Sequence, residues 1–416
     1  MKIALVSAFP PSRRLLNEYG FHIANQLKEQ PAISVTVLAD VMEQAALELP
    51  DFDVVRCWEL NNTFNQGRLL RALRSLKPDV VWFNLLFSTF GNAHNPLAAF
   101  SGLTLPALTR MSGYYTHVTL HHLMDHVDLK DAGIKHPNLY RIAGSVATRI
   151  VLMANSLSVL LPAYRRTLVE KYRGENVHFR AHGILSARPE YPDFSLRTRP
   201  TILVFGKWGT YKRLELLLEA FNSVRRQIPD VRLIVAGADH PMAPGYVQSI
   251  AERCKGDSQI QFTGYVDEAA IPELFRKASV LVMPYSSATG ASGVAHLGCE
   301  FGLPIVCADI PDFREMAADE RLAMLFYRTG DAQELAARLT QVLQDSRLQH
   351  EMAEQNFSAA LRMTMPQIIQ QYLRAFNRNQ RARALEPLAR FRRIPAWVPT
   401  RSALFRAAAP RWSAWM

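Results

Sequence analysis

Short apolar runs recur along the chain, and helical patterns such as residues 20–29 lie between several of them. In the first part of the chain these runs are rich in Val, Ile and Leu. They occupy residues 2–6, 34–39, 79–83, 117–120, 150–154 and 176–180. Near-continuous apolar strands that alternate with helices are typical of a parallel sheet covered on both faces. The pattern therefore predicts a doubly wound, Rossmann-like domain over residues 1–185.

The same alternation starts again after residues 186–200, whose three prolines and alternating charges indicate a linker. Predicted strands follow at residues 201–205, 232–236, 259–262, 279–283, 304–307 and 323–327, with helices at 212–225, 332–345 and 366–379. We expect a second Rossmann-like domain over residues 201–365, and a closing helix, 366–384, that packs back on the first domain. The predicted fold class is α/β, with ligands bound at the carboxyl ends of the strands, in a cleft between the domains.

Composition agrees with two folded domains followed by a basic tail. The chain has 416 residues, of which 49% are hydrophobic and 20% charged, so it can bury a large core. The formal charge is +11, but residues 374–416 hold ten arginines against the single acid Glu386. A nucleic-acid-binding face over the rest of the chain is therefore not indicated.

Cysteine usage and the start of the chain indicate a cytoplasmic protein. Cys57, Cys254, Cys299 and Cys307 form no C-x-x-C pair, which favours reduced thiols in the core. The apolar run that follows Lys2 is too short for a signal peptide.

Residues 80–109 contain no charged side chain unless His94 is protonated, and they are long enough to span a membrane. Asn84 and Pro96 are among the residues that interrupt this stretch, and backbone groups left unpaired at such breaks are unfavourable in lipid. We expect a buried strand and an apolar loop, with a membrane-facing surface as the alternative.

The most informative stretch is residues 203–221, where a buried strand leads into a glycine-containing loop and an amphipathic helix. Gly206 and Gly209 let a ligand approach the backbone, while Lys207 and Lys212 bring two cations close to a helix N-terminus. Such an arrangement suits a diphosphate, although it is neither a Walker A loop nor a G-x-G-x-x-G loop. The alternative is a pair of surface lysines after a strand.

Two further strand-end loops point to the same edge of the second sheet. Residues 262–266 follow one predicted strand, and residues 283–304 follow another. In the longer loop, small residues precede a helical run and leave backbone N–H groups free: Thr289, Gly290, Ser292 and Gly293. Three loops that converge on one edge favour the diphosphate site over surface lysines.

At this point the chain resembles the family 4 glycosyltransferases, which are retaining nucleotide-sugar enzymes with the two-domain GT-B fold. The resemblance covers roughly residues 1–375. The family's G-R-x-x-x-x-K diphosphate signature is similar to Gly206, Lys207 and Lys212, with Lys207 in place of the usual arginine.

The resemblance also implies roles for residues in both predicted domains. A strand that ends in an active-site histidine corresponds to VTLHH, which makes His121 the expected residue and His122 the alternative. The family's G-Y/F-V stretch, whose backbone meets the nucleotide base, corresponds to Gly264, Tyr265 and Val266.

On the acceptor side, the family's first strand leads into a glycine-containing loop and a helix. This arrangement is similar to residues 7–27 and implies an acceptor site at Asn17, Glu18, Tyr19 and Gly20.

One segment departs from the family pattern. The family has two glutamates separated by seven residues, one near the donor sugar and one on the ribose, whereas this chain has Thr289 and Leu297 there. A one-residue gap would instead put His296 at the second place, and Glu300 would substitute only if the helix were displaced. The donor-binding loop is thus expected to use Thr289, Gly290, Ser292, Gly293, Val294 and His296.

Metal sites are less consistent with the pattern. Asp51 and Asp53 match a D-x-D metal-binding signature, but that signature belongs to a different fold from the one predicted here, and the two residues precede a predicted strand. Four histidines suggest a cluster, although alternate residues of a strand point to opposite faces: His117, His121, His122 and His126. We predict no metal, and for His182 a structural turn and a ligand role stay open.

The expected function is a metal-independent, retaining transfer from a nucleotide diphosphate sugar to a hydroxyl of a glycan or lipid-linked glycan, in cell-surface polysaccharide or glycolipid synthesis. No cofactor beyond the nucleotide-sugar co-substrate is expected. Because the glutamates are absent, an inactive donor-binding or scaffold subunit is an alternative. A GT-B sugar-nucleotide epimerase is another.

The tail, residues 385–416, interleaves six arginines with aromatic residues, a mixture that suits the headgroup region of an anionic membrane. Prolines argue against one long helix: Pro387, Pro395, Pro399 and Pro410. We expect short interfacial pieces that hold the enzyme on the inner face of the cell membrane, with aromatic packing on the first domain as the alternative. RNA is not supported as a partner.

Overall fold

The structure is a computed structural model of the chain. It describes residues 1–12, 14–42, 49–92, 95–127, 137–194, 197–240, 243–287 and 290–392, with side chains as far as residue 385. Thr289 and most of the predicted tail therefore lie outside the described residues.

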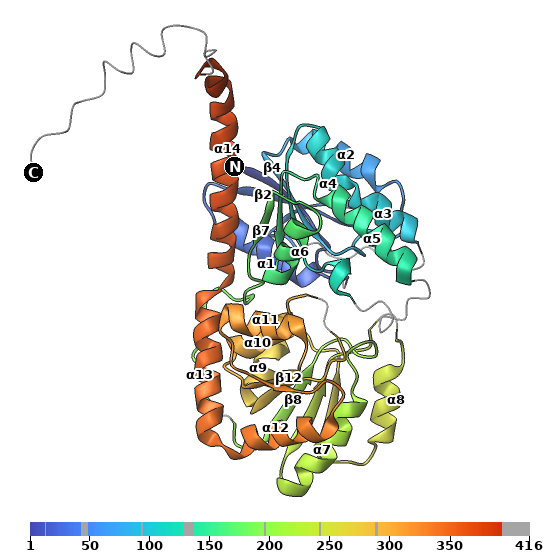
Figure 1. Ribbon diagram of the computed structural model, residues 1–416, viewed down its shortest axis with the longest axis vertical. Coiled ribbons are helices and arrows are strands. Elements are labelled where there is room, and N and C mark those ends of the chain that lie inside the picture. Colours follow the sequence, from blue (N-terminus) through green and yellow to red (C-terminus); the bar gives the residue numbers. More distant parts are fainter. Residues whose placement is uncertain are drawn as a thin grey trace, which may run out of the picture. The chain divides into compact units, whose positions relative to one another are not determined.

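The first sheet has seven parallel strands in the order β3-β2-β1-β4-β5-β6-β7. The strands are β1 (Lys2–Val6), β2 (Ser34–Asp40), β3 (Asp53–Trp58), β4 (Val80–Leu85), β5 (Tyr115–Leu120), β6 (Ser156–Val159) and β7 (Val177–Phe179). The helical segments between them are α1 (Asn17–Lys28), α2 (Asn65–Leu76), α3 (Pro96–Leu103), α4 (Leu105–Met111), η1 (Met124–His126), α5 (Pro137–Val151) and α6 (Pro162–Glu170). Figure 1 shows α2, α3, α4 and α5 together on one side of this sheet.

The second sheet has six parallel strands in the order β10-β9-β8-β11-β12-β13. The strands are β8 (Thr201–Phe205), β9 (Arg232–Ala236), β10 (Ile260–Gly264), β11 (Val280–Met283), β12 (Ile305–Ala308) and β13 (Met324–Tyr327). The helical segments are α7 (Glu215–Gln227), α8 (Tyr246–Arg253), η3 (Glu268–Ala270), α9 (Ile271–Lys277), α10 (Gly293–Glu300), α11 (Pro311–Glu320), α12 (Ala332–Gln344), α13 (Ser346–Arg362) and α14 (Met365–Arg392).

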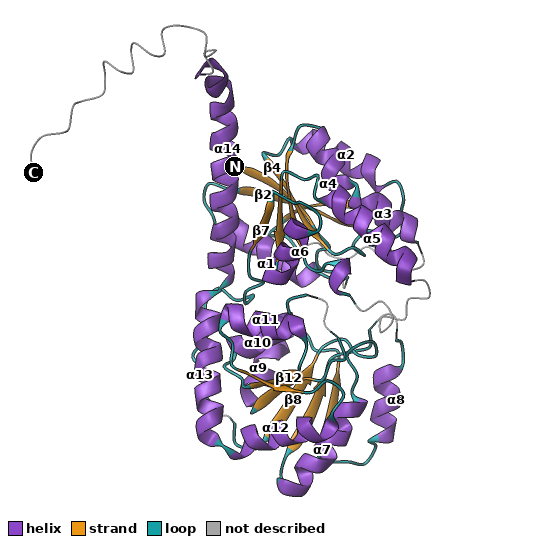
Figure 2. Ribbon diagram, in the orientation of Figure 1, coloured by secondary structure: helices purple, strands orange, loops and turns teal. Residues whose placement is uncertain are grey.

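The predicted α/β fold class is confirmed. Figure 2 shows two separate groups of strands, each flanked by helices. The central strands β4, β5, β11 and β12 are buried along their whole length, as expected when helices cover both faces of a parallel sheet. In each sheet the strand order reverses beside the first strand, between β1 and β4 and between β8 and β11. Ligands of open α/β sheets bind outside the carboxyl ends of the strands at such points.

One predicted strand was wrong. Residues 150–154 are not extended: α5 ends at Val151 and a turn follows, while the strand is β6. Buried residues of α5 recur at helical spacing, which an apolar run alone does not distinguish from a strand. Strand β6 was missed because two of its four residues are serines, so it is not an apolar run. Both serines are buried and hydrogen-bond to the ring of His117 on the neighbouring strand β5: Ser156 and Ser158.

The helix predicted over residues 366–384 is α14, which continues through Pro387 to Arg392. The predicted boundary at residue 385 therefore falls inside a helix, and Pro387, one of four prolines expected to divide the tail into short pieces, does not interrupt it. Residues 1–369 form one compact unit that contains both sheets, and residues 370–416 form a second. The other domain limits, and the packing of the closing helix on the first domain, stay predictions. Within the described residues, no helix is both long enough and apolar enough to cross a membrane.

Candidate functional site

The loops that follow β8, β9 and β10 are joined by backbone hydrogen bonds. The amide of Gly206 donates to the carbonyl of Ala236 at 3.1 Å, and that of Gly237 donates to Gly264 at 2.9 Å. A Cβ atom on Gly237 would lie 1.9 Å from the carbonyl oxygen of Gly206, so a larger residue does not fit there. This close approach brings the predicted diphosphate and base loops together at one edge of the sheet.

Two lysines lie in the first of these loops. The ammonium of Lys212 is 4.8 Å from the ring centre of Tyr285, and Lys207 is close enough to influence its titration. Burial, and after it the charge of Lys207, lowers the pKa of Lys212 to about 8. Neither lysine is within ion-pair distance of a carboxylate in the part of the chain that the structure describes. Two neighbouring cations without a carboxylate partner are an arrangement that suits an anion.

The loop before α10 supplies backbone donors to the same edge. Ser292 caps the helix, since its Oγ accepts from the amide of Ala295 at 3.2 Å. The amides of Gly293 and Val294 have no intrahelical partner and no other partner among the described residues. Gly290 has φ of +96°, and a Cβ atom there would lie 2.3 Å from the carbonyl oxygen of His121. The loop thus touches the end of β5 in the first sheet.

His121, at the end of β5, is buried beside that contact. Its Nε2 lies 2.6 Å from Oδ1 of Asn84 on β4, and the amide nitrogen of Asn84 donates to Ser7. Nε2 therefore carries the proton, and Nδ1 remains an acceptor. Burial, with smaller contributions from His182 and His122, holds the pKa of His121 well below its usual range. The ring is a neutral acceptor at the junction of the two sheets.

The alternative residue, His122, has a different environment. Its ring is half-buried and lies 5.3 Å from that of Phe87. Burial lowers the pKa of His122 to about 4. The part of the chain described here contains no hydrogen-bond partner for this ring. The ring of His121, in contrast, is held in one orientation by Asn84.

A second histidine pair joins the two sheets. The ring of His182 stacks on that of His296 at 4.9 Å, and the side chain of Glu320 on α11 lies 2.9 Å from Nε2 of His296. Nδ1 of His296 lies 2.7 Å from the carbonyl oxygen of Ser292. Nδ1 of His296 therefore donates to Ser292, while Nε2 is within ion-pair distance of the Glu320 carboxylate. Burial acts to lower the pKa of His296, but the carboxylate of Glu320 and the hydrogen bonds outweigh it and raise the pKa.

This cluster was only partly predicted from the sequence. His296 was assigned to the donor loop, a role for His182 was left open and Glu320 was missed. Glu320 lies at the end of α11, in a segment without a recognisable motif, so no signal in the sequence pointed to it. Glu300, considered as a substitute carboxylate, lies in the last turn of α10, where burial raises its pKa.

Residues 17–20 form the start of α1, which faces this cluster. The hydroxyl of Tyr19 donates to the carbonyl of His182 at 3.0 Å, and its ring packs edge-on against His121 at 4.8 Å. A Cβ atom on Gly20 would lie 2.4 Å from Oγ of Ser7, so glycine lets α1 approach β1.

Glu18 is exposed, yet the protein around its carboxyl group raises its pKa. The carboxylate of Glu268 raises the pKa further, while Lys207 lowers it. One turn along α1, His22 is 2.9 Å from Glu268. Helix α1 of the first sheet therefore lies beside the loop that follows β10, where Gly264 and Tyr265 are exposed.

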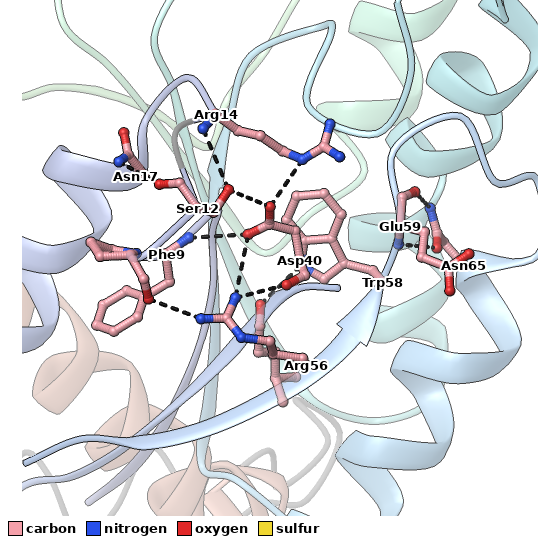
Figure 3. Close-up of polar contacts among 11 residues, drawn as sticks. Phe9, Ser12, Arg14, Asn17, Asp40, Arg56, Trp58, Glu59 and Asn65 are labelled. Carbon is pink, nitrogen blue, oxygen red and sulfur yellow. Dashed lines mark hydrogen bonds and ion pairs between the residues drawn. The ribbon is translucent and has the colours of Figure 1, made fainter. Parts of the chain in front are cut away.

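The loop that leads into α1 is held by a buried carboxylate (Figure 3). Asp40, at the end of β2, accepts from Oγ of Ser12 at 2.6 Å and from the amide of Phe9 at 3.2 Å. Nε of Arg14 lies 3.0 Å from the same carboxylate, and Asn17 donates to the carbonyl of Ser12 at 2.7 Å. The predicted acceptor residues thus begin on a loop fixed by polar contacts.

The alternative metal ligands lie apart from this region. Asp51 is exposed, 3.9 Å from Lys28, and Asp53 starts β3, where it accepts from Thr36 at 2.6 Å. Both lie at the amino end of a strand, opposite to the site. The four histidines are separated as well: His117 binds serines of β6, and Nε2 of His126 lies 2.9 Å from Oγ1 of Thr167. Within the described residues, no three potential ligands form a metal-binding group.

Sequence comparison with known proteins finds a family match in the part of the chain that forms the second sheet. Residues 199–345 match the family model described as "Glycosyl transferases group 1". Alpha-D-kanosaminyltransferase of Streptomyces kanamyceticus is 26% identical over 164 residues, which are 39% of this chain and 41% of that protein. The chain therefore spans about two fifths of the length of this curated relative.

Solved structures extend the similarity to both sheets. Sucrose-phosphate synthase from Thermosynechococcus elongatus superposes with a TM-score of 0.74 at 14% identity, over 92% of this chain and 100% of that one. HepE of Anabaena, in complex with UDP-glucose, superposes with a TM-score of 0.67 at 15% identity, over 91% and 99%. At such identities the likeness shows the fold, which is the two-sheet GT-B arrangement. The fold of the chain is therefore GT-B, and its match to the group 1 glycosyltransferases covers residues 199–345.

Proposed function

We propose that the protein is a metal-independent, retaining glycosyltransferase that moves a sugar from a nucleotide diphosphate sugar to a hydroxyl of a glycan or lipid-linked glycan. Cell-surface polysaccharide or glycolipid synthesis is the proposed context. The observation that carries the proposal is the pair Lys207 and Lys212, which lie together at the carboxyl end of β8 without a carboxylate partner in the described part of the chain.

The proposed chemistry requires charge stabilisation at the departing diphosphate. Lys207 and Lys212 would neutralise the negative charge that develops on the phosphate oxygens. The amides of Ser292, Gly293 and Val294 would add backbone donors at the start of α10. Donors held in place before the reaction are commonly the largest contribution to catalysis of this kind.

His121 would bind the donor sugar on the other side of the reacting carbon. The contact with Asn84 fixes the ring and leaves Nδ1 to accept from a sugar hydroxyl. A neutral ring suits this role, because it accepts a hydrogen bond without repelling the positive charge that develops at the anomeric carbon. In keeping with the family resemblance, the leaving phosphate would take the proton of the incoming hydroxyl, so no separate protein base is required.

The pair of His296 and Glu320 would position the donor loop. It holds the carbonyl of Ser292, the capping residue of α10, from within the core. His296 would act through the loop and would not bind the ribose itself, since its Nδ1 is bonded to Ser292 and its Nε2 faces the buried Glu320 carboxylate. What replaces the family's ribose-binding glutamate is then backbone, not a side-chain carboxylate.

The remaining contacts are proposed by position. The exposed turn at Gly264, Tyr265 and Val266 would meet the nucleotide base, and Asn17 to Gly20 would meet the acceptor. Because HepE, a protein of the same fold, has been solved with UDP-glucose, UDP-sugars are the first donors to test.

A hydrolysis and transfer assay with radiolabelled nucleotide sugars tests the proposal. Label that passes from donor to a glycan or lipid-linked acceptor supports it. Binding without turnover would indicate the scaffold subunit, and a changed sugar that remains on the nucleotide would indicate an epimerase. Either of these outcomes overturns the proposed activity.

A further inference from the structure

The four helices on one side of the first sheet have an unusual composition. Helices α2, α3, α4 and α5 contain six arginines and no aspartate, glutamate or lysine. All six arginines are exposed: Arg68, Arg71, Arg74, Arg110, Arg141 and Arg149. Among the described residues, only Arg68 pairs with a carboxylate, that of Glu59. The layer therefore carries a local excess of positive charge, although residues 1–373 together carry only +2 of the formal charge of +11.

The same layer exposes large apolar side chains. They are Leu97, Phe100, Met111, Leu139, Ile142 and Val146, which are between 36% and 74% exposed. Helix α3 contacts α2, α4 and α5, so these residues belong to neighbouring helices (Figure 1). We call this set of six the outer apolar face.

Helix α5 shows that this face is not an extension of the core. Its buried side is formed by Gly144, Ala147, Thr148 and Val151. Leu139, Ile142 and Val146 are spaced by three and four residues and form a second stripe, turned away from the sheet. A helix with one apolar stripe in the core and another in water usually has a further partner.

The charges decide which partner fits. In a symmetric dimer this face would meet its own copy and bring together the arginines of both subunits, of which only Arg68 has a carboxylate partner among the described residues. Single-stranded RNA would need aromatic rings on which bases stack, whereas the exposed side chains here are mainly aliphatic. An anionic bilayer accepts aliphatic side chains between its headgroups and pairs arginines with its phosphates.

We infer that the outer apolar face docks on an anionic lipid surface, with Leu97, Leu139 and Ile142 inserted among the headgroups and the arginines around them on phosphate groups. Helix α5 packs against η1, where Met124 lies three residues after His121, so docking would bring a membrane close to the candidate site. The inference goes beyond the proposed transfer reaction and does not depend on it, because it concerns binding alone.

Co-sedimentation of the full chain with vesicles tests the docking. Vesicles of phosphatidylcholine with phosphatidylglycerol are compared with vesicles of phosphatidylcholine alone. The double variant Leu139→Asp and Ile142→Asp should bind the anionic vesicles at least about tenfold more weakly than the unchanged chain. The matched control is Leu361→Asp on α13, which changes a comparably exposed leucine away from this face and should bind as the unchanged chain does.

A second set of variants separates the contribution of charge. Arg71→Ala, Arg74→Ala and Arg141→Ala together should make binding fail at a lower salt concentration, because each lost cation weakens attraction to the anionic surface. A full-chain variant with Arg401→Ala, Arg406→Ala and Arg411→Ala measures the tail alone.

Melting temperature controls for folding. The inference is overturned if the Leu139 and Ile142 double variant, folded by this criterion, sediments like the unchanged chain. It is also overturned if only the tail variant loses binding, or if the double variant instead converts a stable dimer into a monomer.

Discussion

At the residue scale, the structure gives Lys212 an environment that a sequence motif cannot reveal. Its ammonium lies beside the ring of Tyr285 and close to Lys207, and in the described part of the chain it has no acidic partner. Gly206 has no side chain on the adjacent side, where a Cβ atom would lie 3.3 Å from Nζ of Lys212. The cation is thus partly desolvated and accessible, which suits an anionic ligand.

Replacing Lys212 with alanine should abolish detectable transfer while leaving the fold intact. A charge-assisted hydrogen bond contributes roughly 1.5–3 kcal/mol, so nucleoside diphosphate affinity should fall by about ten- to hundredfold. Lys207→Ala should behave similarly. Lys255→Ala is the matched control, since that lysine is exposed and pairs with Glu252. Wild-type activity in the Lys212 variant would mean that the phosphate assignment is wrong.

The pKa of Lys212 also predicts a pH dependence. Because its pKa is lowered to about 8, the free protein loses this positive charge as pH rises through that value. Affinity for a nucleoside diphosphate should therefore fall by ~tenfold between pH 7 and 9, a window in which the phosphate is already ionised. Calorimetric titration measures this. Lys212→Arg should bind evenly across the window, and an equally flat profile for the unchanged chain would contradict the assignment.

His121 and His122 can be separated by kinetics. His121→Ala should lower turnover more than it lowers nucleotide affinity, because its proposed contact is with the sugar. His122→Ala serves as the neighbouring control, since its ring has no hydrogen-bond partner among the described residues. Turnover and nucleotide affinity are measured for both variants. A loss in His122→Ala with none in His121→Ala would mean that the wrong neighbour has been chosen.

At the element scale, α10 combines a donor-binding end with a buried ionic contact. Its N-terminus carries the free amides, and one turn later His296 reaches back to the carbonyl of Ser292 and across to Glu320. Side-chain exposure of the pair is 2% and 5%. Breaking a buried pair is more disruptive than breaking an exposed one, because the remaining charge loses both its partner and water.

Glu320→Gln should destabilise the protein by about 3 kcal/mol near pH 6, and by less at alkaline pH. The reason lies in His296, whose pKa is raised in the folded state. The stability from its charged form is fully present below the unfolded value of 6.5 and is lost as pH rises through the folded value. Thermal unfolding at several pH values measures the difference.

Glu354→Gln is the control for that experiment, because Glu354 pairs with His350 in an exposed position and should change stability little at any pH. A Glu320 variant that loses the same stability at every pH would show that His296 is not charged in the folded protein.

Element positions were largely predictable where the chain alternates simply. The strands of the second sheet are short apolar runs between turn residues, and all six were placed to within a few residues. The apolar run at residues 150–154 was wrongly predicted to be a strand. It contains the apolar end of helix α5, whose buried residues recur at helical spacing. Local pattern does not settle such cases, since length and tertiary packing decide them.

At the scale of the whole molecule, the two-sheet fold could be predicted because both halves repeat one alternation. The contacts between the sheets could not. Tyr164 donates to Asp312 across 148 residues of sequence at 3.0 Å, and neither residue belongs to a motif. The stacking of His182 on His296 is of the same kind. Which side chains meet depends on the geometry of both sheets together, and a single sequence does not contain that information in readable form.

The distribution of charge along the sequence also differs from its distribution over the folded protein. Summed along the sequence, residues 374–416 carry +9 of the formal charge of +11, and residues 1–373 carry only +2. Folding gathers the arginines of α2, α4 and α5 on one layer of helices, and these helices contain no aspartate or glutamate. A local excess of charge can therefore arise from topology alone.

The most direct test of the central claim is calorimetric titration of the purified full chain with UDP, GDP, ADP and dTDP in the presence of EDTA. At least one of these nucleoside diphosphates should bind without a divalent cation, and Lys212→Ala should lose that binding. Binding that appears only when manganese or magnesium is added, and that persists in Lys212→Ala, would contradict the proposed diphosphate site. Asp51 and Asp53 would then become the candidate metal ligands.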